Sequence, residues 1–192
     1  MGAAGTGKST LARALVASLE ADGMVVAHLD GYRHTFSIER GRAPRQDEQA
    51  AIAAEQTRRI TAARDARLRP VDVVVADTTA LVTAVYSELV FGDTTLYAQA
   101  LADHRQADLT LLMAPDLPHP ADVLLREALL GAGIGFSVIG GQGPQRLASA
   151  RAAWAATQRR AAAPARSRAP GGWRHHCGRC GDPSCEQHLF SR

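Results

Sequence analysis

The sequence of 192 residues lacks long apolar runs, contains three cysteines and has a single lysine. Because no apolar run reaches the roughly 20 residues of a membrane span, we expect no membrane-spanning segment. No basic stretch followed by an apolar one opens the chain, so we expect no secretory signal. The cysteines gather near the C-terminus, which argues against a disulfide scaffold. These absences predict a cytoplasmic protein without a membrane partner.

The composition predicts one globular domain with a short appendage. Hydrophobic residues make up 46% of the chain and charged residues 21%, which are ordinary values for a domain with a buried core. The segment 161–172 is rich in alanine, proline, arginine and glycine, which indicates a linker. We therefore predict a domain over 1–160, a linker over 161–172 and a tail over 173–192.

Lysine is nearly absent although the chain is basic, with a formal net charge of +3. Of the 22 basic residues, all except Lys8 are arginine. Lysine carries a compact point charge on a flexible stem, whereas the arginine head is a planar fork. A single lysine in a chain whose other basic residues are all arginine indicates a position where arginine could not replace it, such as a phosphate-binding loop.

Lys8 belongs to a glycine-rich motif of the form G-x-x-x-x-G-K-[ST], which a helical pattern follows directly. The glycines let backbone amides converge on phosphate oxygens at the positive end of that helix. Lys8 would reach the outer phosphates, the Ser9 hydroxyl would bind Mg²⁺ and Thr10 would contact the inner phosphate. The motif predicts that ATP or a similar nucleotide is bound by Gly2, Gly5, Thr6, Gly7, Lys8, Ser9 and Thr10.

Strand and helix patterns alternate along the rest of the chain. Apolar runs predict strands at about 24–29, 71–76, 109–114 and 135–139. Periodicity predicts helices at about 8–21, 47–67, 80–91, 94–104, 121–131 and 144–160. The glycine, arginine and proline content of 31–46 predicts a loop with at most a helical turn. Such alternation predicts an α/β fold, a three-layer, kinase-like P-loop NTPase with a parallel sheet between helices, plus a short C-terminal Cys/His tail.

The segment before the motif departs from this plan. A P-loop ordinarily follows a strand, and only Met1 precedes the motif in this sequence. Two interpretations stay open at this point: the protein starts upstream of Met1, or it is a truncated form without its central strand.

The apolar run 73–76 ends in a carboxylate, Asp77, which Thr78 and Thr79 follow. Ligands of open α/β sheets bind at the carboxyl ends of the strands. An acid there can hold Mg²⁺ through water, or accept a substrate hydroxyl or its proton. The alternative is an N-cap for the next helix, which these residue types also suit. Asp30, after the preceding strand, is a weaker second candidate.

Several segments, taken as a set, resemble one kinase family. The set is similar to the NadR-type ribosylnicotinamide kinase domain, and to the stand-alone AAA-type, NadR-like P-loop ATPases. The resemblance covers roughly residues 2–155. It rests on the segments 41–44, 47–49, 77–88, 91–93, 108–112 and 115–118.

The resemblance implies a fold that binds ATP and Mg²⁺ and transfers the γ-phosphoryl group to the hydroxyl of a nicotinamide riboside-like nucleoside. Lys8 and Ser9 correspond to the phosphate and Mg²⁺ contacts. Asp77, with Thr78 beside it, corresponds to the acid near substrate or metal. We expect Lys8 and Asp77 to be catalytic, Asp77 also to bind Mg²⁺, and Tyr32, Arg33, Asp77 and Thr78 to bind the substrate.

The loop after the first predicted strand departs from the family pattern. The family has an acid, a tyrosine, any residue and an arginine, whereas this chain has Gly31-Tyr32-Arg33-His34. The acid is lost and the arginine lies one position earlier.

The lid of the family is also missing. The family continues after Leu-Pro with Trp-Val-x-Asp-Gly-x-Arg, whereas Pro118 here leads almost directly into the helix at Ala121. A lid excludes water and completes the catalytic set, and in this family it supplies a charge-stabilising arginine. Arg126 is a candidate replacement for that arginine.

The tail offers a second metal site. Cys177, Cys180, Cys185 and His188 could complete a four-ligand Zn²⁺ site, although their spacing is compressed. The alternative is a reduced, flexible tail. The segment 151–192 is rich in arginine, but no aromatic residues alternate with these charges, so we favour a solvated tail over a nucleic-acid contact.

Three hypotheses follow for the function. The first is an ATP-dependent, NadR-like kinase acting on a small nucleoside. The second is a nucleotide-binding module with little or no catalysis, because the lid and the first strand are missing. The third and weakest is a regulatory ATPase whose basic Cys/His tail binds zinc or contacts nucleic acid.

Overall fold

The computed structural model describes residues 1–3, 5–115 and 117–162. The chain divides into two units, 1–158 and 159–192, and only 159–162 of the second are described. The predicted zinc ligands therefore lie outside the described residues, as does nearly all of the predicted linker. Among the described helices, none combines the length and the apolar character that a bilayer crossing requires.

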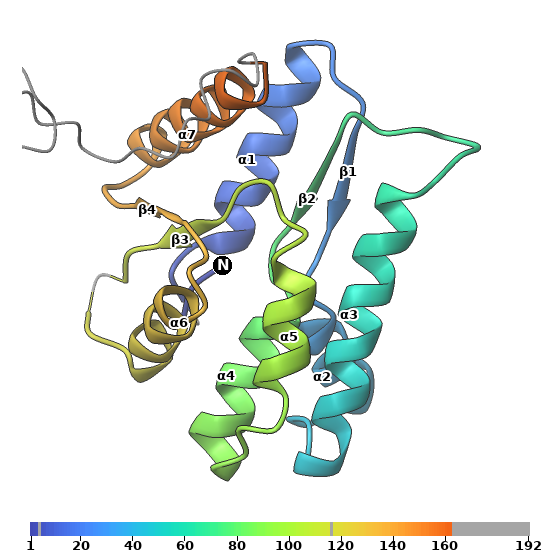
Figure 1. Ribbon diagram of the computed structural model, residues 1–192, viewed down its shortest axis with the longest axis vertical. Helices are drawn as coiled ribbons and strands as arrows, with labels where there is room; N and C mark the ends of the chain where they lie inside the picture. Colours follow the sequence, from blue (N-terminus) through green and yellow to red (C-terminus); the bar gives the residue numbers. More distant parts are fainter. Residues whose placement is uncertain (4, 116, 163–192) are drawn as a thin grey trace, which may run out of the picture. The chain divides into compact units, whose positions relative to one another are not determined.

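The described residues form a mixed α/β unit, which confirms the predicted class. The helices and strands alternate along the chain as the sequence patterns predict (Figure 1). The elements are α1 (Lys8–Ala21), β1 (Val26–Leu29), α2 (Tyr32–Arg40), a 3₁₀ turn (Gln46–Glu48), α3 (Gln49–Arg64), β2 (Val73–Ala76), α4 (Ala80–Phe91), α5 (Tyr97–His104), β3 (Leu111–Met113), α6 (Pro120–Gly131), β4 (Ser137–Ile139) and α7 (Pro144–Ala162).

The strands pair in parallel, as predicted, but in two separate pairs. β1 pairs with β2 from Val26↔Val73 onward, and β3 pairs with β4 from Leu111↔Ser137 onward. Helices connect the two strands of each pair, as parallel connections require. The described strands therefore do not form the single four-stranded sheet that the sequence suggests.

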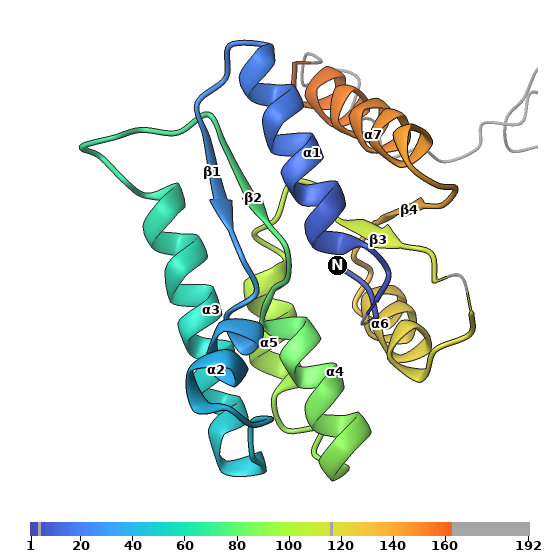
Figure 2. The same ribbon diagram turned by 180° about the vertical axis from the view of Figure 1, so that it is seen from behind.

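Met1 lies between the two pairs (Figure 1, Figure 2). Its amino group donates a hydrogen bond to the Leu111 carbonyl at 2.7 Å, and the Met113 amide donates to the Met1 carbonyl at 2.9 Å. This is the bond pattern of a parallel bridge opposite Leu112. A cavity of about 50 Å³ adjoins Met1 between α1, β2 and β3. In the described part of the chain, Met1 is bonded to β3 at this position, and the two strand pairs are separate.

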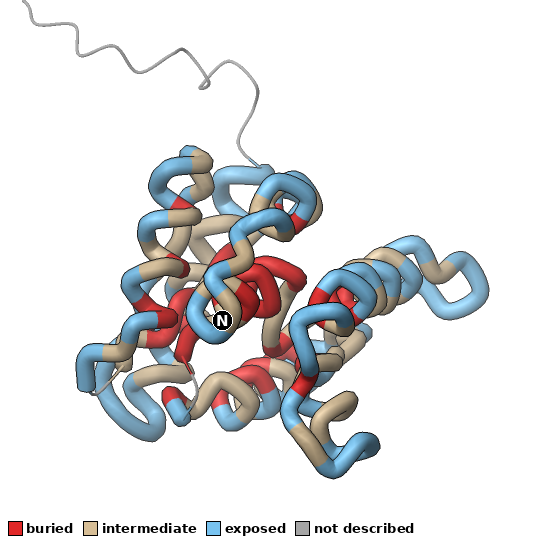
Figure 3. The backbone as a smooth tube through the Cα atoms, turned by 90° about the horizontal axis from the view of Figure 1, so that it is seen from below, coloured by how far each residue is buried: buried red, intermediate tan, exposed pale blue. Residues whose placement is uncertain are grey.

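The strand side chains alternate between two apolar clusters, as a period of two requires. Leu112 belongs to the cluster that α4 and α6 build, whereas Leu111 and Met113 belong to the cluster that α1 and α7 build. Buried residues gather in the interior and the outer turns of the helices are exposed (Figure 3). α1 thereby packs against strands of both pairs, which places its N-terminus at their carboxyl ends.

The segment 31–46, predicted as a loop with at most a helical turn, is more helical than predicted, because α2 occupies Tyr32–Arg40. Tyr32 and Phe36 lie one helical turn apart, and their rings meet edge to face with centroids 6.3 Å apart. The arginine content that suggested a loop is compatible with a helix, since arginine is a good helix former. Gly41 ends the helix in the left-handed conformation, at φ 62°.

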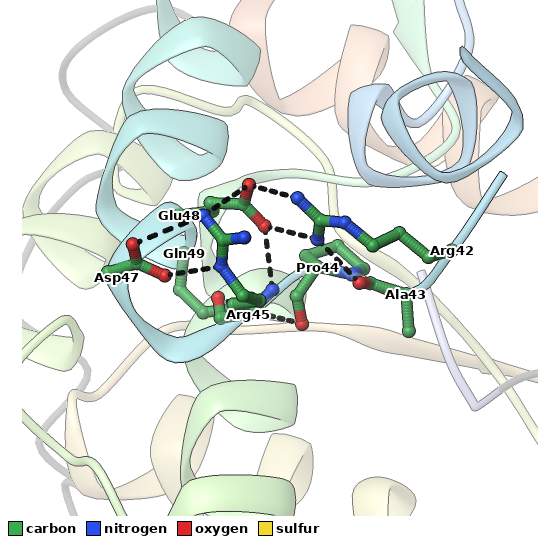
Figure 4. Close-up of polar contacts among 7 residues, drawn as sticks. All are labelled: Arg42, Ala43, Pro44, Arg45, Asp47, Glu48 and Gln49. Atoms are coloured by element: carbon green, nitrogen blue, oxygen red, sulfur yellow. Dashed lines mark hydrogen bonds and ion pairs between the residues drawn. The ribbon is translucent and has the colours of Figure 1, made fainter. Parts of the chain in front are cut away.

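A polar cluster joins α2 to α3 (Figure 4). The Glu48 carboxylate accepts hydrogen bonds from the Arg42 guanidinium at 2.7 and 2.6 Å, and from the Arg45 amide at 2.8 Å. The Arg42 bonds, with the Arg45 amide second, lower the pKa of Glu48 to about 2. Asp47, where the sequence predicts the start of the helix, pairs with Arg45 at 3.2 Å, and Glu48 holds the N-cap position of α3.

His104 connects the start of α4 to the start of β3. Its Nδ1 lies 3.1 Å from the Thr79 hydroxyl and its Nε2 lies 2.9 Å from the Thr110 hydroxyl. The side chain is buried. Burial, with the nearby amino terminus adding to it, lowers the pKa of His104 to about 4. The folded protein therefore holds this imidazole neutral at neutral pH.

The lowered pKa of His104 predicts a loss of stability in mild acid. In the unfolded state His104 is protonated below about pH 6.5, whereas in the folded state it is protonated only below about pH 4. The free energy of unfolding therefore falls as the pH falls through this range. We expect this loss, roughly 2 to 3 kcal/mol, to disappear in His104→Gln. Urea unfolding between pH 7 and pH 4.5 measures it, with the exposed His34→Gln as control. An unchanged pH slope in His104→Gln would contradict the assignment.

Met1 lies between the edges of β2 and β3, and we predict that a strand added before Met1 stabilises the fold. We expect a Val-Ile-Val-Val extension on the Met1 amino group to raise the melting temperature by several degrees, because it would bury apolar side chains and pair the edges of β2 and β3. The extension also removes the buried amino group of Met1, whose pKa is lowered to about 5 by burial. Calorimetry at pH 7 measures the effect against a Gly-Asp-Gly-Asp extension. Equal melting temperatures would show that no strand docks there.

Candidate functional site

Three glycines shape the loop that leads into α1. Gly2, Gly5 and Gly7 have φ angles of 147°, 76° and 79°, which side-chain-bearing residues rarely adopt. A Cβ at Gly2 would lie 3.0 Å from the Cβ of Met113. The loop therefore curls tightly against the end of β3, and α1 starts at Lys8 with its free amides at the loop.

The polar side chains of this loop are bound to its own backbone. The Lys8 Nζ donates to the Ala3 carbonyl at 2.8 Å, and the Thr6 hydroxyl donates to the same carbonyl at 2.9 Å. Burial lowers the pKa of Lys8, and the negative charge of Asp77 opposes this shift. Ser9 is half-buried and Thr10 is exposed at the first turn of α1. The loop thus holds a partly desolvated cation at a helix N-terminus, which is the chemistry of an anion site.

Asp77 follows β2 and lines the same small cavity as Lys8. Asp77 is 6% exposed, and its Oδ1 is buried without a hydrogen-bond partner among the described residues. Thr79, not Asp77, holds the N-cap position of α4. The capping alternative for Asp77 therefore does not apply, and Asp77 lines one cavity with the lysine of the loop.

Gln56, on α3, joins the loops that follow β1 and β2. Its Oε1 accepts from the Tyr32 amide at 2.6 Å, and its Nε2 donates to the Thr78 carbonyl at 3.1 Å. The two loops touch directly as well, because a Cβ at Gly31 would lie 2.8 Å from the Thr78 hydroxyl oxygen. One buried amide thus positions both segments that carry the predicted substrate-binding residues.

Tyr32 and Arg33, at the start of α2, each meet a side chain of another helix. The guanidinium of Arg59 lies 4.2 Å from the centre of the Tyr32 ring. The guanidinium of Arg33 lies 4.5 Å from the centre of the Tyr86 ring on α4. The Arg33 Nε is buried without a hydrogen-bond partner among the described residues, and burial lowers the pKa of Arg33.

The sequence-predicted residues fall into two groups that meet at Asp77 and Thr78. Lys8 and Asp77 share one cavity, whereas Tyr32 is connected to Thr78 through Gln56. Arg126 does not join either group in its described contacts: it forms an ion pair with Asp122 at 2.7 Å on α6.

The chain enters α6 directly after Pro118 and His119. The His119 Nδ1 accepts a hydrogen bond from the Ala121 amide at 3.1 Å and caps the helix, which begins at Pro120. This confirms the prediction that the chain passes from Pro118 almost directly into a helix. A proline at the first helical position has no amide to leave unpaired, which suits this short entry.

Sequence reasoning missed two residues of this region. Gln56 carried a signal, since it lies in the buried register of α3, one turn from Ile52, and a polar residue there needs partners. For Arg146 the sequence gives little indication of a role at this site, beyond its position after the glycine-rich segment 140–143. Its Nη1 donates to the Thr6 carbonyl at 2.9 Å across 140 residues of sequence.

Few side chains of the candidate site are suited to bind a metal ion. The described part of the chain contains no cluster of three or more His, Cys, Asp or Glu side chains that could hold a metal ion. Ser9 and Asp77 nevertheless fit Mg²⁺ as partial ligands, because hard cations take oxygen ligands and Mg²⁺ usually keeps several waters and binds substrate phosphates. The unpartnered Asp77 Oδ1 is the observation that supports this fit.

The glycine-rich loop, the helix it opens and the adjoining carboxylate define a nucleotide-binding P-loop domain of the α/β class. Residues 1–130 match the family described as AAA domain. The chain belongs to this family, which supports binding of ATP at the loop. A search of curated proteins finds no match to the chain.

The position of Gln56 predicts a large loss of stability on truncation. Gln56→Ala leaves the Tyr32 amide and the Thr78 carbonyl without their partners, and we expect it to cost about 2 to 4 kcal/mol of unfolding free energy. Urea unfolding measures the change. The control is Gln99→Ala, because Gln99 is exposed and bonds only Asp103 in its described contacts. A cost for Gln56→Ala as small as that for Gln99→Ala would disprove the bridging role.

Proposed function

We propose that the protein binds ATP with Mg²⁺ and transfers the γ-phosphoryl group to the hydroxyl of a nicotinamide riboside-like nucleoside. The observation that carries this proposal is the shared cavity of Lys8 and Asp77, where a cation at a helix N-terminus faces a buried carboxylate. Family membership supports the nucleotide. The resemblance to NadR-type kinases supports the acceptor and the three-layer, kinase-like fold as part of the proposal.

Phosphoryl transfer requires the protein mainly to position the reactants and to stabilise the charge on the phosphates. The amides of Gly5, Gly7 and the first turn of α1 would bind phosphate oxygens, and Lys8 would leave the Ala3 carbonyl for an outer phosphate. Mg²⁺, held by Ser9 and Asp77, would neutralise charge on the phosphates. The acceptor oxygen forms the new bond to phosphorus while the bond to the ADP oxygen breaks. Asp77 would position the acceptor hydroxyl and take its proton.

The acceptor would bind where the loops after β1 and β2 meet. Thr78 offers a hydroxyl beside Asp77, and Tyr32 and Arg33 begin the helix that faces it. The Gln56 bridge fixes these two loops relative to each other, and such fixed geometry is what in-line transfer requires.

A second candidate function is nucleotide binding with little catalysis. One observation favours it: His119 caps α6 directly, so the chain has no segment at this point to close over ATP. Without closure, water competes with the acceptor and the charge on the phosphates is less well compensated. This candidate keeps the same nucleotide site and differs in turnover.

The proposal predicts that Lys8 cannot be replaced, even by arginine. We expect Lys8→Ala and Lys8→Arg to weaken ATP binding about 10- to 100-fold, because a charged hydrogen bond is lost or misplaced. Titration calorimetry with ATP and Mg²⁺ measures this. The control is Arg13→Ala, an exposed cation on the same helix.

The same proteins separate the two candidates when phosphorylation of nicotinamide riboside is followed. Turnover that requires the nucleoside and is lost in Lys8→Ala supports the kinase. ATP binding without turnover supports the binding module, and activity that survives in Lys8→Ala contradicts the proposed site.

A further inference from the structure

Arg33 connects α2 to α4, the two helices that begin at the loops where the acceptor would bind. It lies in the first turn of α2, directly after Tyr32, and its guanidinium carbon lies 4.5 Å from the centre of the Tyr86 ring on α4. α2 follows the loop after β1, α4 follows the loop after β2, and Gln56 joins these loops. Arg33 therefore places a positive charge on the acceptor side of the candidate site.

This charge is partly withdrawn from water without an anionic partner. The Arg33 side chain is half-buried, and its Nε is buried without a hydrogen-bond partner among the described residues. None of the ion pairs in the described part of the chain includes Arg33. Burial lowers its pKa. A cation in such surroundings is costly unless an anion compensates it.

Arginines of the neighbouring segments differ from Arg33 in this respect. Arg42, which follows α2, pairs with Glu48 at 2.6 Å. Arg59, whose guanidinium lies over the Tyr32 ring, pairs with Glu55 at 2.8 Å. These cations are compensated by the chain itself, whereas the compensation for Arg33 would have to come from a ligand.

The guanidinium of Arg33 suits one kind of anion. Its two terminal nitrogens have no hydrogen bond to the described residues and are not buried, so a ligand can reach them. A planar guanidinium binds a carboxylate through two parallel hydrogen bonds. The contact with the Tyr86 ring restrains the guanidinium, which reduces the entropy that is lost when a ligand binds.

The same charge discriminates between acceptors. The ring of nicotinamide riboside is a pyridinium, which carries a positive charge, and Arg33 would repel it at a partly desolvated position. A carboxylate in place of the carboxamide makes the nucleoside neutral overall and provides the guanidinium with a partner.

We propose that the acceptor is a nucleoside whose base bears a carboxylate, and that Arg33 is the residue that selects it. The carboxylate binds the guanidinium between α2 and α4, while the acceptor hydroxyl lies at Asp77. The inference rests on the proposed kinase function and narrows its acceptor from nicotinamide riboside-like nucleosides in general to the acidic ones.

The test compares nicotinamide riboside with nicotinic acid riboside, which differ in a carboxamide against a carboxylate. Initial rates of ADP formation, with ATP and Mg²⁺, give KM and kcat for the wild-type chain, Arg33→Gln and Arg40→Gln. Arg40 is the matched control, because it is an exposed cation on the same helix whose guanidinium also lies over a ring, that of Phe36, at 5.5 Å.

We expect the wild-type chain to have a kcat/KM about 10-fold or more higher for nicotinic acid riboside, because a charged hydrogen-bonded pair forms with that acceptor alone. Arg33→Gln should remove this preference by raising the KM for nicotinic acid riboside, while the KM for nicotinamide riboside stays the same or falls. Arg40→Gln should keep the wild-type preference.

Two kinds of failure are distinguishable. Equal kcat/KM values in the wild-type chain, a preference for nicotinamide riboside, or equal losses for both acceptors in Arg33→Gln would overturn the inference and leave the kinase function standing. A wild-type chain that binds ATP and phosphorylates neither nucleoside overturns the proposed function, and this inference with it. Thermal melts check each variant for folding, and the wild-type comparison tests the inference even where Arg33→Gln does not fold.

Discussion

The nucleotide loop depends on the two backbone hydrogen bonds between Met1 and β3. They are the bonds that tie the start of the loop to a strand, because the position between β2 and β3 holds no further paired residue in the described chain. Gly2 then lies against Met113 and the Thr6 side chain, and α1 starts at Lys8, six residues after Gly2. A loop held at one bridged residue is less constrained than one that continues a strand, so its own contacts through Lys8, Thr6 and Arg146 gain importance.

A second constraint acts on the other side of Asp77. Gln56 and His104 are buried polar side chains with partners at both ends, and each bonds to the segment 78–79. Buried polar groups of this kind are costly unless all their bonds are made. The segment that carries Asp77 and Thr78 is therefore fixed from α3 and α5, while Lys8 approaches Asp77 from α1. The candidate site therefore has one segment fixed by buried polar side chains, and a loop whose lysine bonds to the backbone of the loop itself.

Much of this could be predicted from the sequence, because local signals carry it. The motif around Lys8 predicts both the loop and the helix that follows, and the bounds of α1 and α4 agree with their apolar periodicity. Asp77 stays a prediction as a site residue: a continuous apolar run predicts a parallel strand, ligands bind at the ends of such strands, and Asp77 does follow β2 in the cavity that Lys8 lines. The length of α2 was underestimated because the glycine- and arginine-rich sequence around it obscures a short repeat of two aromatic residues, Tyr32 and Phe36.

The remaining features depend on distant contacts that no local pattern encodes. Arg146 meets Thr6 only because α7 packs beside α1, and the bond spans 140 residues. The separation of the strands into two pairs likewise depends on what lies between β2 and β3. The cap formed by His119 and the ion pair between Arg126 and Asp122 are also not encoded in the local patterns that predict α6.

Hydrogen–deuterium exchange with and without ATP and Mg²⁺ tests the central claim most directly, since it reports on the amides that would bind the phosphates. Nucleotide binding at the loop predicts slower exchange for residues 5–10, with smaller protection at 77–79 and around Arg146. Unchanged exchange in 5–10 at saturating nucleotide, or protection confined to other segments, would contradict the assignment of this loop as the nucleotide site.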